Sequence, residues 1–444
     1  MSLIETQYEL VTPAMSMRST ENAYFSEIRT DNTTITNDTQ FRLQLKNLND
    51  YINLSKSYLE CKFRIKKGAS QLLTADDITT LQNGMTSLFS RLVLRVNGSI
   101  VEDVNEANLV GLIKSILHYS DDYLKSVGSN GFYYKETGTG AIDGVPEYNI
   151  ISVPTEDPVL VRNSNYNNGF VQRFALSKES SLVCCALPLH ELFGFCTIDR
   201  VMKNCDVSIE LTKASADASV CGTVANAYVE MEKISWWVSV QKPTAQVELA
   251  LNAQLAQGVV SEWKYPYATG YDSSTFPAST SGRQNFRVST TAEKPLYAFA
   301  MLHGATQSVL LNNQVSNNAV SEIAMRMNGV QHPQQAYQPV KNGSNEYTDF
   351  ARIYADVLDY MKKDEDYSNG GTLLRNDWVN MTSIFAFDLT ASPPSLTNSP
   401  IELVCEFSLD GTSNNVDTKM FVCVITERSI VLTFRGSSAV VSTN

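Results

Sequence analysis

Hydrophobic and polar residues alternate with a period of two along much of this chain. The clearest stretches are "YLECKFRIKK" (residues 58–67), "CDVSIELTK" (205–213) and "PIELVCEF" (400–407). In the first of them every second residue from Leu59 to Ile65 is apolar, and the residues between are charged. Because successive side chains of a strand point to opposite faces, each stretch is predicted to be a β-strand with one buried face.

Other stretches are apolar almost throughout. They are "LFSRLVLRV" (88–96), "LYAFAMLHG" (296–304) and "MFVCVITERSIVLTF" (420–434). Such runs are typical of strands that lie between two layers and are buried on both faces. Loops rich in Asn, Ser, Gly and Pro separate the strands. Many short strands with irregular loops predict all-β sandwich domains.

Helical periodicity is scarce. It is clear over Glu106–Tyr119 and over Glu346–Met361, where apolar residues recur every three or four positions. A shorter helical turn is expected in "LHELFGF" (189–195).

One motif occurs twice. "LRVNG" (94–98) and "MRMNG" (325–329) each end a predicted strand with Asn-Gly, a pair that favours a tight turn with positive φ. Each motif is followed by one of the two clear helices. The same elements in the same order indicate a tandem duplication. The alternative is coincidence between two common turn dipeptides.

The chain of 444 residues therefore divides into two halves. We expect an N-terminal arm over residues 1–40, a first all-β domain over 41–242, a second over 243–436 and a C-terminal tail over 437–444. Each domain is predicted to carry one inserted helix. The arm is expected to be extended because its residues are too polar to build a core.

Composition narrows the class of protein. Hydrophobic residues make up 43% of the chain and charged residues 18%, which suits folded cores. A net charge of -12 without a Lys/Arg run disfavours nucleic-acid binding, so we expect no sequence-specific binding of this kind. We expect no signal peptide and no transmembrane segment. The eight Cys include no CxxC pair and are read as reduced, packed thiols, with Cys184 and Cys185 on opposite faces of a strand.

From the sequence we predict no catalytic residue, no cofactor-binding residue and no metal site. No GxSxG, HExxH or Gly-rich phosphate loop occurs in the sequence. His190 is read as a surface or turn histidine, because no second His follows at helical spacing. The acidic groups of Asp121–Tyr123 and Lys362–Tyr367 lack the spacing of a cation-binding loop and are read as solvated helix ends. The chain is therefore not expected to be an enzyme.

Several segments resemble those of double jelly-roll major capsid proteins, especially those of Polinton-like viruses and adintoviruses. The more specific ones are "LPLHELFGFCTIDRVMKNCDVSIELTK" (187–213), with its Phe-Gly-Phe turn, and "WVNMTSIFAFDLTA" (378–391), with its Phe-Asp-Leu-Thr strand. The stretches over 50–68, 84–103 and 399–408 are similar to further strands of the family.

The resemblance implies an all-β fold of two tandem eight-stranded jelly rolls, that is, a double jelly roll. It implies a structural protein of the virion, a homotrimer whose six similar domains form a pseudo-hexameric capsomer. Such capsomers would tile an icosahedral capsid around a DNA genome. The partners would be further copies of the chain, a penton protein and minor capsid proteins, with no cofactor.

Two other hypotheses remain open. One is an assembly scaffold with the same fold that is not retained in the virion. The other is a carbohydrate- or receptor-binding β-protein, with an aromatic site around Tyr228, Trp236 and Trp237. A hydrolase on the same scaffold is disfavoured by the missing His and carboxylate groupings.

Overall fold

The structure is a computed structural model of the whole chain. The residues that it describes are 20–30, 35–36, 38–46, 50–136, 150–151, 159–160, 168–222, 224, 226–257, 259–292, 294–304, 320–339, 349–363, 378, 384–390, 401–411, 417–435 and 438–443.

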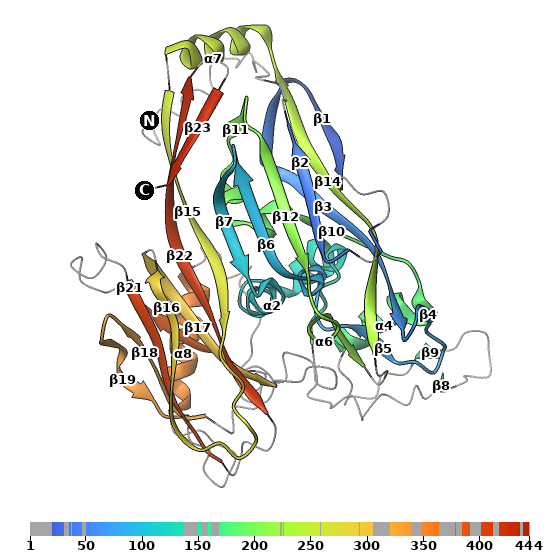
Figure 1. Cartoon of the computed structure of the whole chain (residues 1–444), viewed down its shortest axis with the longest axis vertical. Helices are drawn as coiled ribbons and strands as arrows, with labels where there is room; N and C mark the ends of the chain where they lie inside the picture. Colours follow the sequence, from blue (N-terminus) through green and yellow to red (C-terminus); the bar gives the residue numbers. More distant parts are fainter. Residues whose placement is uncertain are drawn as a thin grey trace, which may run out of the picture.

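The first half of the chain forms a sandwich of two antiparallel sheets (Figure 1). One sheet has the order β1 (Thr20–Arg29), β14 (Ala227–Pro243), β3 (Tyr51–Lys67), β10 (Val183–Pro188). The short strands β4 (Gln71–Leu72) and β11 (Val201–Met202) also pair with β3. The facing sheet has the order β2 (Gln40–Leu45), β12 (Val207–Lys213), β6 (Phe89–Val96), β7 (Ser99–Asn105). Two small ladders lie outside these sheets: β5 (Thr79–Leu81) with β13 (Val220–Gly222), and β8 (Ile150–Ile151) with β9 (Val159–Leu160).

The second half repeats this architecture. One sheet has the order β15 (Val259–Asp272), β22 (Thr418–Arg435), β17 (Pro295–Gly304), β20 (Phe385–Asp388), and β23 (Ser438–Thr443) is added at β22. The other has the order β16 (Gly282–Ala292), β21 (Ile401–Leu409), β18 (Val320–Met327), β19 (Val330–Tyr337).

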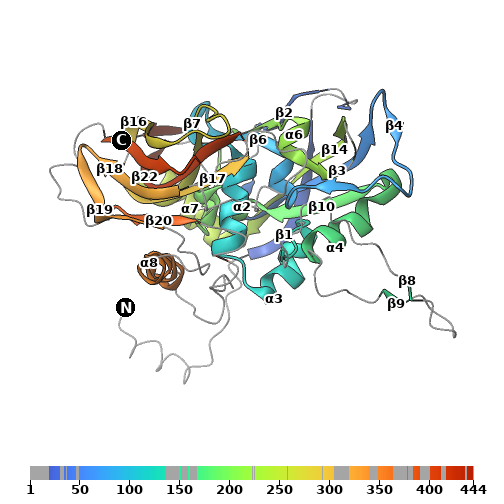
Figure 2. The same ribbon diagram turned by 90° about the horizontal axis from the view of Figure 1, so that it is seen from below.

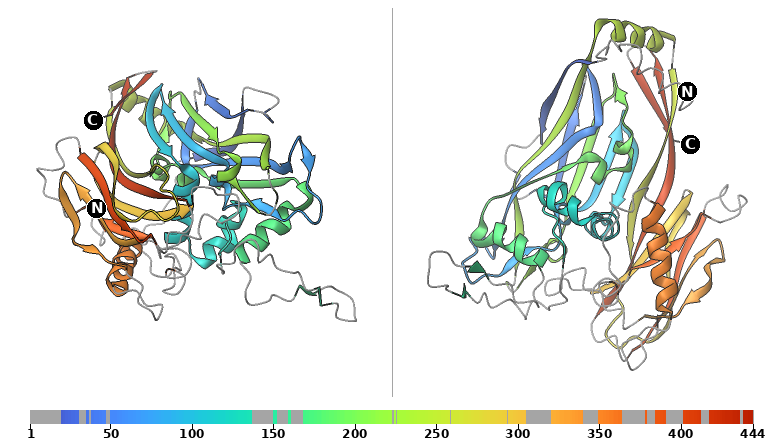
Figure 3. Two further views of the ribbon diagram at one scale, coloured as in Figure 1. Left: turned by 60° about the horizontal axis from the view of Figure 1, so that its bottom comes forward. Right: turned by 180° about the vertical axis from the view of Figure 1, so that it is seen from behind.

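Both halves have the topology of a jelly roll. When the eight main strands of either half are numbered along the chain, one sheet has the order 1-8-3-6 and the other 2-7-4-5. The two rolls lie side by side in all views (Figures 1 and 3). The predicted fold, a double jelly roll built from two similar halves, is therefore confirmed.

The repeated Asn-Gly motif makes equivalent contacts in the two rolls. In the first roll Asn97 has a φ of 49° and turns β6 into β7. Its backbone N–H donates to the Asp206 carbonyl at 2.7 Å, and its side-chain oxygen accepts the Asp206 N–H at 2.7 Å. Arg95 pairs with Glu210, four residues beyond Asp206, at 3.1 Å.

The second roll has the same set of contacts around its Asn-Gly turn. We call this set of contacts the Asn-Gly clasp in both rolls. Asn328 has a φ of 47°, donates to the Glu402 carbonyl at 2.9 Å and accepts the Glu402 N–H at 2.7 Å. Arg326 pairs with Glu406, again four residues further on, at 2.6 Å. Coincidence between two turn dipeptides would not reproduce three matching contacts, so the clasps support the duplication.

Both predicted helices are present. The first is α2 (Ala107–Leu117), and the second is α8 (Phe350–Lys363). The expected short turn is α5 (Leu189–Leu192) followed by the 3-10 turn η5 (Gly194–Thr197). Further short helices of the first roll are α3 (Asp121–Tyr123), α6 (Ala216–Ser219), η1 (Met85–Leu88), η2 (Leu124–Gly128) and η4 (Lys178–Ser180).

Two longer helices were not predicted. Helix α4 (Asn168–Ser177) buries Phe170 and Phe174, but also Arg173, whose guanidinium donates to the carbonyls of Leu81 and Gln82. A buried arginine breaks the apolar pattern that marks a helix face. Helix α7 (Ala245–Gln257) crosses from the first roll to the second at one end of the molecule (Figure 1). It has no clear apolar face because most of its described side chains are exposed.

The two ends of the chain differ from expectation. The predicted arm, residues 1–40, contains β1, which pairs along β14 from Thr20 to Arg29. The predicted tail, residues 437–444, contains β23, which pairs with the end of β22. These segments are therefore parts of sheets. Strand β1 is an edge strand of its sheet and most of its described side chains are exposed, so it tolerates a polar sequence. Residues 1–19 lie outside the described residues.

The alternating strands bury the residues that the pattern selected. In β3 the side chains of Leu59, Cys61, Phe63 and Ile65 are all fully buried. Buried residues of both rolls form one continuous core. All eight cysteines are free; Cys184 is exposed and Cys185 buried, as expected from neighbours on a strand.

Candidate functional site at the junction of the two rolls

The junction between the rolls is formed by β7, α2 and η5 of the first roll and by β15 and β22 of the second, with α2 near the centre of the molecule (Figure 2). The Val101 carbonyl in β7 accepts two hydrogen bonds from the second roll. The Tyr265 hydroxyl donates at 2.7 Å and the Arg428 guanidinium at 2.8 Å. The Asn105 N–H donates to the Thr269 hydroxyl at 3.3 Å. The main chain of one roll is thereby fixed to side chains of the other.

Phe195 makes an aromatic contact across the junction. Its ring stacks on Trp263 at 5.4 Å and meets Tyr265 edge-on at 5.3 Å, both residues of the second roll. The main chains of the two rolls also approach each other closely at Gly194. A Cβ atom added to Gly194 would lie 1.8 Å from the Pro266 carbonyl oxygen. Only glycine fits at this position because any side chain would collide with main chain.

A buried carboxylate positions this segment. Glu102, in β7, is 1% exposed and accepts the backbone N–H groups of Gly194 and Phe195, each at 2.9 Å. Burial raises the pKa of Glu102 to about 7, although the two N–H groups and the charges of Lys114 and Arg428 lower it. The charge of Glu102 therefore changes near neutral pH at the residue that positions Phe195.

A second carboxylate lies nearby with the opposite behaviour. Glu191 pairs with Lys114 at 2.8 Å and accepts the hydroxyls of Tyr119 and Tyr123 at 2.9 and 2.8 Å. Burial raises its pKa, but the Lys114 charge and these hydrogen bonds together outweigh burial, and the pKa of Glu191 falls to about 2. Glu191 therefore stays charged and ties α2 to α5.

The two inserted helices also meet at the junction. The Tyr360 hydroxyl of α8 lies 2.9 Å from Nε2 of His118, which follows α2, and the two rings pack edge-on at 5.4 Å. His118 is thus engaged with the second roll, a contact that the sequence did not indicate.

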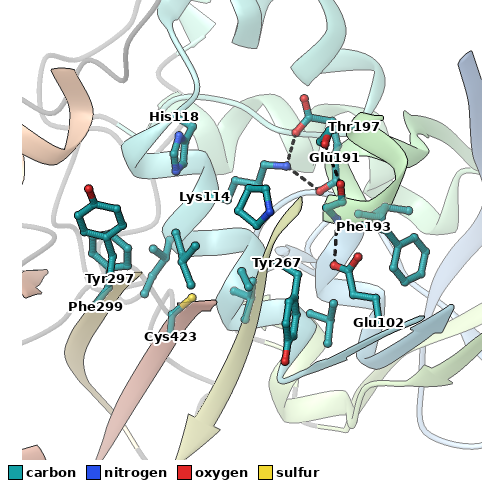
Figure 4. A pocket seen from close by; sticks show the side chains of 18 of the residues that line it. Glu102, Lys114, His118, Glu191, Phe193, Thr197, Tyr267, Tyr297, Phe299 and Cys423 are labelled. Carbon is teal, nitrogen blue, oxygen red and sulfur yellow. Dashed lines mark hydrogen bonds and ion pairs between the residues drawn. The ribbon is translucent and has the colours of Figure 1, made fainter. Parts of the chain in front are cut away.

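A cavity of about 460 Å³ lies between the rolls beside these contacts (Figure 4). Its polar lining includes Glu102, Lys114, His118 and Glu191. Most of the remaining lining is apolar and comes from both rolls: Val104, Val110, Ile113, Leu192 and Phe193 from the first, and Ala268, Leu296, Phe299, Cys423 and Ile425 from the second.

The structure does not bring together the aromatic residues of the carbohydrate-binding hypothesis. Trp236 is fully buried in the core. Trp237 points to the opposite face, stacks on Tyr58 at 6.1 Å and donates to Glu60 at 3.0 Å. Tyr228 lies at the other end of β14, where its hydroxyl donates to Ser70 at 3.3 Å. The opposite orientation of the two tryptophans is as predicted for neighbours on a strand.

The other sequence candidates are satisfied by local partners. Nδ1 of His190 lies 3.2 Å from the Ser55 carbonyl. In α3, Asp121 pairs with Lys135 at 2.8 Å and Asp122 lies 3.8 Å from Lys125. Of the acidic segment 362–367, residues 364–367 lie outside the described residues.

The outer face of the sheet containing β1 and β14 carries cross-strand ion pairs and one aromatic cluster. The cross-strand pairs are Glu27–Lys233, Arg64–Glu232 and Lys66–Glu230. Two further pairs, Glu27–Arg29 and Glu60–Lys62, each lie within one strand. Phe25, which is 50% exposed, packs edge-on against Tyr58 at 5.4 Å. Exposed aromatic clusters of this kind are typical of protein contact surfaces.

Sequence reasoning missed Glu102 and the role of Phe195. The only signal for Glu102 was its position in "SIVEDVN", where a carboxylate interrupts the apolar side of a strand. Phe195 lies in the Phe-Gly-Phe turn, for which the sequence predicted a short helical turn and a point of resemblance but no contact between the rolls.

The described residues hold neither a metal-binding group nor a membrane-spanning helix. Within the described ranges, no three His, Cys, Asp or Glu side chains are grouped so that they could hold a metal ion. None of the helices in that same part of the chain has the length and apolar character needed to cross a membrane.

Comparison with known proteins gives matches by structure alone. No protein-family profile matches the sequence, and no curated protein matches it. Among solved structures, a chain of the Sputnik virophage structure is similar with a TM-score of 0.59 and 10% identity, over 96% of this chain and 89% of the other. The mavirus major capsid protein is similar with a TM-score of 0.55 and 10% identity, over 94% and 90%.

The Faustovirus major capsid protein is similar as well, with a TM-score of 0.52 and 8% identity, over 97% of this chain and 94% of the other. At these identities the similarity concerns the fold. It extends over 94–97% of this chain and therefore includes both rolls.

Proposed function

We propose that this chain is a viral major capsid protein, a structural protein rather than an enzyme. Three copies would form a homotrimer with six similar jelly rolls, a pseudo-hexameric capsomer. Capsomers would tile an icosahedral shell around a DNA genome, so that the protein is located in the virion. A penton protein at the vertices and minor capsid proteins are the further expected partners.

One observation carries the proposal: two rolls of identical strand order stand side by side in one chain. Three such chains around a threefold axis present six similar units, which is a shape that packs in a plane. The fold similarity to the mavirus and Faustovirus major capsid proteins over at least 94% of this chain supports the same role.

The junction explains how the unit keeps its shape. Phe195, the Val101 carbonyl and the contact between His118 and Tyr360 hold the rolls at a fixed mutual angle. In a lattice of trimers, a deviation in the angle between the rolls would displace every contact between neighbouring trimers. A junction that keeps this angle constant therefore favours regular assembly.

The test is the mass and shape of the purified full-length protein. Three chains of 49.2 kDa give about 148 kDa by light scattering. Electron microscopy of the same sample is expected to show particles with threefold symmetry and a six-sided outline. A monomer at every concentration, or a particle without threefold symmetry, would overturn the proposal.

Mass spectrometry of purified virions distinguishes a capsid protein from an assembly scaffold with the same fold. A capsid protein is expected to be among the most abundant proteins of the mature particle. A scaffold with the same fold would be present in assembling particles and absent from mature ones.

A further inference from the structure

We propose that the cavity between the two rolls is a binding site for an uncharged, mainly apolar small molecule. The inference does not depend on the role in a capsid, because it rests on the walls and polar groups of the cavity alone.

The walls determine the apolar character of the ligand. Val104, Val110 and Ile113 line the cavity from the first roll, and Phe299 and Ile425 from the second. A ligand surrounded by these side chains removes apolar surface from water on both sides at once. The volume of about 460 Å³ lies within the range of about 300–1,000 Å³ in which pockets hold drug-sized molecules.

The polar groups determine that the ligand is uncharged. Lys114 already donates to the Glu191 carboxylate at 2.8 Å and to the Glu191 carbonyl at 2.9 Å. Glu102 already accepts two N–H groups, and His118 is engaged with Tyr360. A negatively charged group on the ligand would lie beside the Glu102 and Glu191 carboxylates and would have to take Lys114 from Glu191. A positively charged group would compete with Lys114 and with the N–H donors for the same two carboxylates, so in neither case is its desolvation fully compensated.

The position of the cavity gives binding a consequence. Because the lining comes from both rolls, a bound molecule contacts both and is bound less well when they separate. Binding is therefore linked to the closed arrangement of the junction, and occupancy stabilises it.

The experiment uses the full-length protein and the uncharged fluorescent probe N-phenyl-1-naphthylamine. We expect saturable binding of one probe per chain, displaced by 1-decanol. Decanoate, which has the same chain length and a negative charge at pH 8, is expected to displace the probe at least about tenfold less effectively.

A filling variant locates the site. Ala268, in β15, lines the cavity, and Ala268→Phe adds a ring to it. We expect this variant to weaken probe binding at least about tenfold. The matched control is Ala336→Phe in β19, a half-buried strand alanine that does not line the cavity, and its binding should equal that of the wild type. Ile425→Phe fills the cavity from β22 and serves as the second variant if Ala268→Phe does not fold.

Three results would overturn the inference. They are the absence of saturable probe binding to the wild-type protein, wild-type binding by a folded filling variant, and tighter binding of decanoate than of 1-decanol. The last result would show that a charged ligand is preferred.

Discussion

Glu102→Gln tests how the junction responds to pH. The substitution keeps the size of the side chain and removes its charge. Glu102 lies in β7, is 1% exposed and holds the N–H groups of Gly194 and Phe195 at 2.9 Å. A glutamine can accept one of these N–H groups through its carbonyl oxygen, but its amide nitrogen cannot accept the other.

The magnitude follows from the pKa. Burial raises the pKa of Glu102 from 4.5 to about 7, and at about 1.4 kcal/mol per unit this corresponds to about 3–4 kcal/mol. Because the pKa in the folded protein is the higher one, this stabilisation is complete below about pH 4.5 and is lost as the pH rises to about 7. The variant lacks this dependence but loses one hydrogen bond at every pH, at a cost of about 1–2 kcal/mol.

The assay is urea denaturation of both proteins between pH 4.5 and 8, followed by tryptophan fluorescence. We expect the wild type to be the more stable protein at pH 4.5 and to lose its advantage by pH 8. Glu191→Gln is the matched control at the same junction, because the pKa of Glu191 is lowered to about 2 and its contribution is constant in this range. If the difference between the wild type and Glu102→Gln is the same at every pH, the reasoning about Glu102 is wrong.

Three further predictions concern other features. Asn97→Ala and Asn328→Ala each remove the side-chain hydrogen bond of one clasp, so each substitution should lower the free energy of unfolding by about 1–2 kcal/mol in urea denaturation. If only one of the two substitutions is destabilising, the clasps are not equivalent. Gly194→Ala places a Cβ 1.8 Å from the Pro266 carbonyl oxygen, and a loss of at least about 2 kcal/mol in the same assay is expected; wild-type stability would show that the close approach is absent. Phe25→Ser removes an exposed ring from the outer face of the sheet containing β1 and β14, so the free energy of unfolding of the monomer should change by less than about 0.5 kcal/mol, and light scattering should show the proposed trimer dissociating at a higher protein concentration than the wild type. Unchanged dissociation would exclude this face from the trimer interface.

The strands could be predicted from the sequence because burial of one face produces an alternation of apolar and polar residues. The alternation from Leu59 to Ile65 corresponds residue by residue to the buried face of β3. The same holds for the two helices with an apolar stripe, α2 and α8. The Asn-Gly motif indicated the duplication because a turn with positive φ needs particular residues at a particular place.

Other elements have no such pattern in their sequence. Strand β1 is held by main-chain hydrogen bonds to β14, which any sequence can make, so its polar residues suggested an arm. The buried Arg173 is tolerated in α4 because carbonyls of another segment accept its hydrogen bonds and the Glu136 carboxylate pairs with its charge. The junction depends on pairs such as Phe195 and Trp263, which are 68 positions apart in the printed sequence, and no local pattern relates them.

Helix α7 separates the described strands of the two rolls completely: β1 to β14 precede it, and β15 to β23 follow it. On the ribosome, the first roll therefore has every one of these strands available before the second is synthesised, and it can close without waiting. During that interval the side of the first roll that bears Phe195 has no partner. During synthesis the folded first roll therefore exposes an apolar face to water. The rate at which the second roll is synthesised and folds determines how long this face stays exposed.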